Sequence, residues 1–127
     1  DRAVREMRAG SKQFTVWGDP GVVRDLLYVD DQIDAILTAD AAFENCILNC
    51  NSNRPIAIGD FAKAVLRALK WDVEIVYPAG SFRGTEYKTL DASRFLVATG
   101  WQPKTGLAEG IQAILQEDYG IDRSGLK

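Results

Sequence analysis

Short runs of β-forming residues alternate with amphipathic segments along the 127 residues of the chain. Residues 14–17 and 22–29 are each typical of a short strand, and the Gly/Pro cluster at residues 18–21 predicts a turn between them. Further strands are expected at residues 46–50, 56–58, 73–77 and 87–90, and helices at residues 1–10, 31–42, 60–70, 91–100 and 107–116. Asp30 or Asp31 is expected to cap the helix at residues 31–42. Because regular strand–helix–strand units are missing, we predict a small mixed α/β fold.

Composition excludes several classes of function. Hydrophobic residues make up 46% of the chain and charged residues 26%, which are ordinary globular values. A net charge of −3 argues against nucleic acid or an anionic membrane as a partner. No apolar run approaches the roughly 20 residues of a membrane-spanning helix, so we expect a soluble, cytoplasmic protein.

Cysteine and histidine usage limits the possible chemistry. Cys46 and Cys50 lie in one expected strand, about 13 Å apart, which is too far for a disulfide between them. We interpret them as reduced thiols of the core, with a redox or metal role as the alternative. The chain has no histidine, so we expect no metal site and no Ser-His or Cys-His nucleophile pair.

The run from residue 14 to residue 31 carries the most specific chemistry. Arg24 follows a glycine turn that lets the backbone approach a ligand closely, and a guanidinium can bind a phosphate through two parallel hydrogen bonds. Trp17 offers an aromatic face to a base or a ribose. The run therefore predicts a nucleotide diphosphate site. In the alternative interpretation, Trp17 is a half-buried core residue and Arg24 pairs with Asp25 or Asp30 on the surface.

Three blocks of sequence resemble one enzyme class in the same order and at similar spacing. They are VWGDPGVVRDLLYVDD, ILNCNSNRPIAIGDFAKAV and RGTEYKTLDASRFLVATGWQPKTGLAEGI. Together they are similar to the substrate side of NAD(P)-dependent sugar-nucleotide epimerases, dehydratases and reductases, in the extended short-chain dehydrogenase class. Asn53 stands where that class usually has glycine. Within the class, the residues around Trp17 and the run RGTEYKTLD look most like the GDP-fucose synthase family.

The resemblance implies both a fold and a site. The fold would be the small mixed α/β substrate-binding lobe of such an enzyme. The site would bind a nucleotide-diphosphate sugar through Trp17, Arg24 and Lys88. Lys88 would supply a second positive charge beside Arg24, although a lone lysine in a loop is often simply solvated.

The catalytic parts of the same class do not match this chain. No glycine-rich turn of the dinucleotide-binding type joins a strand to a helix. The class uses a Tyr-x-x-x-Lys pair, and no lysine stands four positions after Tyr28, Tyr77, Tyr87 or Tyr119. The first ten residues also look like the end of a helix entered part-way, with a free-standing N-terminal helix as the alternative. We therefore expect a single substrate-binding domain over residues 1–127 that belongs to a longer polypeptide, contains no catalytic residue and binds neither NAD nor NADP alone.

The leading hypothesis is that a Rossmann lobe of the same polypeptide holds NAD or NADP while this chain positions the substrate. A separated lobe should expose apolar surface, either on the predicted helix with Ile33, Ile36 and Leu37 or on the first helix with Val4 and Met7. A stand-alone binding or regulatory module without catalysis is the alternative, and a domain with a purely structural role is a third.

Overall fold

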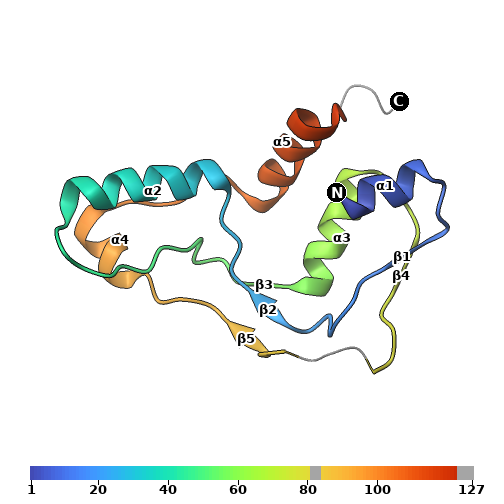
Figure 1. Ribbon diagram of the computed structural model, residues 1–127, viewed down its shortest axis with the longest axis horizontal. Helices are drawn as coiled ribbons and strands as arrows, with labels where there is room; N and C mark the ends of the chain where they lie inside the picture. Colours follow the sequence, from blue (N-terminus) through green and yellow to red (C-terminus); the bar gives the residue numbers. More distant parts are fainter. Residues whose placement is uncertain (81–83, 123–127) are drawn as a thin grey trace.

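The computed structural model describes residues 1–80 and 84–122, and their elements follow one another in a mixed α/β order (Figure 1). The helices are α1 (Arg2–Arg8), α2 (Val29–Ala42), α3 (Ile58–Ala68), α4 (Ser93–Thr99) and α5 (Leu107–Tyr119). The strands are β1 (Gln13–Thr15), β2 (Val23–Arg24), β3 (Ile56–Ala57), β4 (Glu74–Val76) and β5 (Tyr87–Lys88). The predicted mixed α/β class is confirmed.

The described strands form two small sheets. In the first, β1 and β4 run parallel, with Phe14 opposite Ile75. In the second, β2 lies in the middle, antiparallel to β3 and parallel to β5. Helices α1 and α3 lie at the end of the molecule that holds the first sheet, and α2 and α4 lie at the opposite end (Figure 1). The three-stranded sheet therefore connects the two ends.

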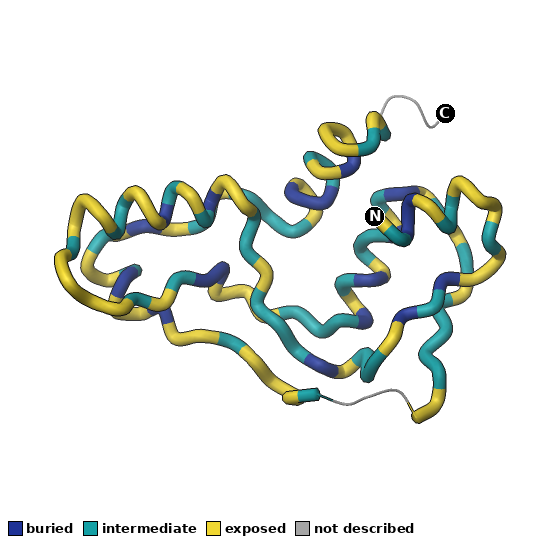
Figure 2. Tube along the Cα trace, viewed as in Figure 1, coloured by how far each residue is buried: buried dark blue, intermediate teal, exposed yellow. Residues whose placement is uncertain are grey.

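Each end has its own hydrophobic core, as the buried positions in Figure 2 show. The larger core joins α1, α3, α5 and the first sheet, and its most enclosed side chain is Leu69. The smaller core lies between α2 and α4. There the ring centroid of Phe95 lies 5.5 Å from that of Trp101 and 6.5 Å from that of Phe43, and the rings are tilted to one another. Gly100 ends α4 in the left-handed conformation, with φ of 66°, which turns the chain so that Trp101 enters this core.

The glycine turn is fixed to helix α3 by a close backbone contact. The Gly59 N–H donates to the Pro20 carbonyl oxygen at 2.9 Å. A Cβ atom at Gly59 would lie 2.9 Å from Pro20 Cβ, so only glycine fits at this position without a shift. This contact sets where β2 begins, and β2 carries Arg24.

The predicted strands differ from the structure in their bounds, and two differ most. The strand expected over residues 22–29 is only Val23–Arg24, because Asp25 turns away to bind a loop. The strand expected over residues 46–50 is not formed, since these residues pair with no strand of the described residues. Ile47, within it, is 92% exposed.

The acids at the start of α2 and one cysteine also differ from expectation. The residue at the N-cap of α2 is Tyr28, without a side-chain cap, so neither Asp30 nor Asp31 has that role. Asp31 is buried and accepts hydrogen bonds from the backbone N–H groups of Lys104 and Thr105, at 3.1 and 2.9 Å, which joins α2 to the segment before α5. Cys46 is exposed rather than part of the core, whereas Leu48 and Cys50 of the same segment pack against the smaller core.

The expected exposed apolar surface lies on α2 and not on α1. Ile33, Ile36 and Leu37 are 51%, 57% and 64% exposed. They lie on one face of α2 and extend over more than one helical turn, and this face is uncovered. On α1, Val4 is buried and Met7 packs against the larger core. The exposed face of α2 is visible in Figure 2.

Candidate substrate site

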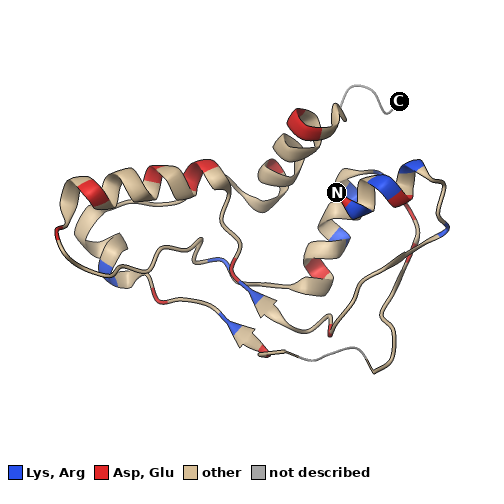
Figure 3. Ribbon diagram, viewed as in Figure 1, with Lys and Arg blue, Asp and Glu red and all other residues tan. Residues whose placement is uncertain are grey.

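A cavity of about 420 Å³ that is lined by charged, polar and apolar residues lies beside strands β2 and β5. We call it the β2–β5 cavity, and its lining residues are Arg24, Asp25, Leu27, Gln32, Cys50, Asn51, Lys88, Thr89 and Leu90. Two of the three predicted site residues, Arg24 and Lys88, are among them. They are register partners in the parallel ladder, so their side chains start from adjacent positions on neighbouring strands. Figure 3 shows basic residues on both strands.

Both cations of this cavity are available to an anion. The Arg24 guanidinium donates to the carbonyl oxygens of Val23 and Thr85, at 2.7 and 3.0 Å. These bonds orient the guanidinium but leave its charge uncompensated. Within residues 1–80 and 84–122, neither Arg24 nor Lys88 pairs with a carboxylate. The surface pairing of Arg24 with Asp25 or Asp30, considered above, is therefore not what the structure shows.

Asp25, the nearest carboxylate to Arg24 along the chain, is occupied by a loop. It accepts hydrogen bonds from the Asn51 side-chain amide at 2.8 Å and from the Ser52 N–H at 2.9 Å, and the Ser52 hydroxyl donates to the same carboxylate. Asn51 also donates to the Leu90 carbonyl oxygen at 2.7 Å. Asn51 thus connects the segment after β2 to the segment after β5.

Asn51 and Ser52, which bind Asp25, are both buried. Asn51 is 4% exposed, and its Oδ1 atom has no hydrogen-bond partner among the described residues. A buried polar atom without a partner costs about 1–3 kcal/mol. The bonds to Asp25 and Leu90 must offset that cost, so they hold the amide firmly.

Cys50 lines the cavity with a thiol whose pKa is raised. Burial raises the pKa of the Cys50 thiol, and the negative charge of Asp25 raises it further. The thiol form therefore predominates at neutral pH, and the reactive thiolate is scarce.

Trp17, the third predicted site residue, lies elsewhere. Its indole is 70% exposed and is not part of the lining of the β2–β5 cavity. The alternative of a half-buried core position for Trp17 is wrong, because Val16 belongs to the larger core and Trp17 does not. The structure thus brings Arg24 and Lys88 together and leaves Trp17 outside the cavity.

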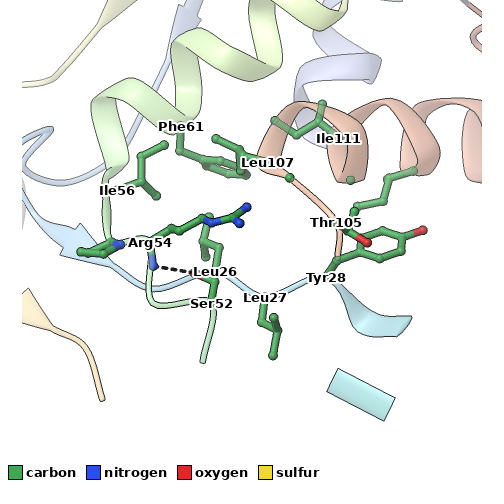
Figure 4. A pocket seen from close by; sticks show the side chains of 14 residues that line it. Leu26, Leu27, Tyr28, Ser52, Arg54, Ile56, Phe61, Thr105, Leu107 and Ile111 are labelled. Carbon is green, nitrogen blue, oxygen red and sulfur yellow. Dashed lines mark hydrogen bonds between the residues drawn. The ribbon is translucent and has the colours of Figure 1, made fainter. Parts of the chain in front are cut away.

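A second, mainly apolar cavity of about 390 Å³ lies between the β2–α2 connection and helices α3 and α5 (Figure 4). Phe61, Leu107 and Ile111 line it from the helices, and Arg54 and Ser52 line it from the loop before β3. The Arg54 N–H donates to the Ser52 hydroxyl oxygen at 3.1 Å, so one serine contacts both this loop and Asp25. Sequence reasoning missed this cavity, because its walls come from four separate segments.

Comparison with known proteins identifies the family. The family model described as "NAD dependent epimerase/dehydratase family" matches residues 1–50. A GDP-L-fucose synthase from Sinorhizobium fredii is 34% identical over 99 residues, which cover 77% of this chain and 31% of that protein. GDP-L-fucose synthase 1 from Arabidopsis thaliana is 29% identical over 105 residues, which cover 80% of this chain and 32% of that protein. The chain belongs to the NAD dependent epimerase/dehydratase family.

Solved structures support this assignment to the epimerase/dehydratase family. RMD from Pseudomonas aeruginosa, complexed with NADPH, superposes with a TM-score of 0.79 at 26% identity, covering 91% of this chain and 39% of that one. UDP-glucose 4-epimerase from Thermotoga maritima, with UDP-glucose, superposes with a TM-score of 0.74 at 27% identity. The match covers 96% of this chain and 38% of that one. The chain therefore spans about a third of the length of its curated relatives and somewhat more of these structures.

The glycine turn differs from the dinucleotide-binding turn of this class of fold. In the described part of the chain, the turn at residues 18–21 connects β1 to β2 and not a strand to a helix N-terminus, where dinucleotide phosphates bind in this class of fold. The same part contains no group of three or more histidine, cysteine, aspartate or glutamate side chains able to hold a metal ion. Its helices are each too short or too polar to cross a membrane.

Proposed function

We propose that this chain is the substrate-binding part of a nucleotide-sugar epimerase, dehydratase or reductase, and that the β2–β5 cavity binds the diphosphate of the substrate. One observation carries the proposal: in a chain of this family, Arg24 and Lys88 are register partners at one cavity and neither pairs with a described carboxylate. A guanidinium and an ammonium side by side suit two neighbouring phosphate groups. The exposed indole of Trp17 is proposed to contact the base, outside the cavity.

In this proposal the chain contributes positioning rather than chemistry. NAD or NADP and the acid–base residues belong to a Rossmann lobe outside the sequence given. Fixing the diphosphate orients the sugar toward that lobe, which lowers the entropic part of the reaction barrier. The single domain over residues 1–127 would thus form one wall of the active-site cleft.

The proposed contact with the Rossmann lobe is the uncovered face of α2. Ile33, Ile36 and Leu37 form its centre, and the stretch at residues 46–50, with Ile47, has the composition of a strand without a partner strand in the described residues. An uncovered apolar face is costly in water, and a segment of strand-like composition without a partner strand can pair with another strand, so a second lobe would cover both. The same features weigh against a stand-alone binding module.

The test of diphosphate binding uses the 127-residue protein and GDP as the probe. Amide chemical shifts are followed in a GDP titration to millimolar concentration, because half a cleft binds weakly. Arg24→Ala and Lys88→Ala should each weaken GDP binding about tenfold or more, since each removes charge-assisted hydrogen bonds. Trp17→Ala should weaken it less.

The matched control is Arg67→Ala, which removes an exposed arginine on α3 that is not part of the β2–β5 cavity. It should leave GDP affinity unchanged. Equal losses in the Arg24 and Arg67 variants would indicate general charge attraction and would refute the site.

A further inference from the structure

The ladder that places Arg24 beside Lys88 is unusually short. β2 and β5 pair over two residues, Val23 with Tyr87 and Arg24 with Lys88. One more backbone bond, from the Val23 N–H to the Glu86 carbonyl oxygen at 2.8 Å, precedes the pair. A parallel ladder of this length is weak on its own, so the separation of the two cations must be held by something else.

Asn51 supplies that connection on the far side of the two cations. Its amide nitrogen donates to the Asp25 carboxylate at 2.8 Å and to the Leu90 carbonyl oxygen at 2.7 Å. Asp25 follows Arg24 directly, and Leu90 lies two residues after Lys88. One buried side chain therefore links both strands just beyond the residues that bear the charges.

Asp25 has a second effect on the same site. A carboxylate next to a phosphate-binding arginine would normally compete with the ligand for the guanidinium. Here its oxygens accept from Asn51 and Ser52, and no bond to Arg24 forms among the described residues. The loop thus keeps Asp25 turned toward Ser52 and leaves Arg24 to the cavity.

We propose that Asp25 and Asn51 are positioning residues that set the spacing of Arg24 and Lys88, and that this spacing makes the site select a diphosphate over a monophosphate. The proposal rests on the proposed function of the cavity. Neighbouring strands are about 4.8 Å apart, so a fixed pair of cations can contact two adjacent phosphate groups at once. If the strands separate, each cation binds a phosphate independently, and the second phosphate of the ligand adds little.

The measurement is the ratio of GDP affinity to GMP affinity in the 127-residue protein. We expect the unaltered protein to prefer GDP about tenfold or more, because only GDP engages both cations. Asn51→Leu keeps the size of the side chain but removes both donors, and the preference should fall to about threefold or less as the second contact is lost. Asp25→Glu displaces the carboxylate by one methylene and should lower the ratio in the same direction.

Asn49→Leu is the matched control. Asn49 donates to the Asp91 carbonyl oxygen at 3.0 Å, so the same kind of bond is lost in the same stretch of chain, but Asn49 does not line the cavity. The control should keep the GDP preference. Thermal unfolding identifies any variant that fails to fold, and Asp25→Glu decides the outcome if Asn51→Leu is unfolded.

The outcomes separate the two proposals. If Arg24→Ala and Lys88→Ala weaken GDP binding but the ratio is unchanged in Asn51→Leu and Asp25→Glu, the site stands and the spacing role is refuted. If Arg24→Ala and Lys88→Ala have no effect on GDP binding, the proposed function itself fails. A ratio that falls equally in Asn49→Leu would also overturn the spacing role.

Discussion

Gly59→Ala should destabilise the protein, although alanine is normally favoured over glycine in a helix. An alanine in the interior of a helix gains up to about 1 kcal/mol over glycine. At Gly59, however, the new Cβ would lie 2.9 Å from Pro20 Cβ, 3.2 Å from the Pro20 carbonyl oxygen and 3.3 Å from the Tyr77 hydroxyl. Overpacking of this kind typically costs about 1–3 kcal/mol, so we expect a net loss of about 1–2 kcal/mol.

The assay is thermal and urea unfolding of a double-mutant cycle. For a domain of this size, each kcal/mol lost from the free energy of unfolding lowers Tm by about 3–5 °C. Pro20→Gly removes the nearest atom, so Gly59→Ala should cost less in the Pro20→Gly background. Because the turn leads into β2, the amide signals of Val23 and Arg24 should also shift. A stabilising effect of Gly59→Ala, or the same cost in both backgrounds, would refute this packing argument.

Three further predictions concern the surface, the pH dependence and the cofactor. Replacing Ile33, Ile36 and Leu37 together by serine should reduce self-association in sedimentation experiments with little change in Tm, because these side chains are exposed; unchanged association would contradict the uncovered-face interpretation. Hydrogen bonds from Lys104 and Trp101 lower the pKa of Asp34 below its ordinary value of 3.8, so its contribution to stability is present above that pH and is lost as pH falls through the lowered pKa. Asp34→Asn should therefore flatten the acid limb of a stability–pH curve, and an unaltered limb would show that another group controls it. Calorimetry should detect no binding of NAD or NADP to the 127-residue protein, and micromolar affinity for either would overturn the division of roles between the lobes.

Local sequence signals predicted the parts of the fold that depend on local interactions. Helix α3 was predicted because Phe61, Val65 and Leu69 recur at helical spacing, and their packing confirms the pattern. Residues 46–50 were predicted as a strand from composition alone, but a strand needs a neighbour, and the described residues provide none. The cap predicted at Asp30 or Asp31 was wrong. Tyr28 holds the N-cap position, and the Asp31 carboxylate binds backbone N–H groups of Lys104 and Thr105, far along the sequence.

The sequence likewise predicted only part of the candidate site. The adjacency of Arg24 and Lys88 followed from the resemblance of two separate blocks to one enzyme class, and the register of β2 and β5 places them together. The bridge from Asp25 through Asn51 to Leu90 joins three segments distant in sequence, so no local pattern could indicate it. Trp17 was grouped with the cations through sequence proximity and family resemblance, whereas the structure places its indole outside the cavity.

The most direct test of the central claim is the kinetics of Arg24→Ala in an enzyme that joins this chain to a dinucleotide-binding lobe. If Arg24 holds the diphosphate and takes no part in the chemistry, KM for the nucleotide sugar should rise by roughly one to two powers of ten, which corresponds to about 1.5–3 kcal/mol of charge-assisted bonding. The value of kcat should change much less. An unchanged KM, or a loss confined to kcat, would contradict the assignment of the β2–β5 cavity as the diphosphate site.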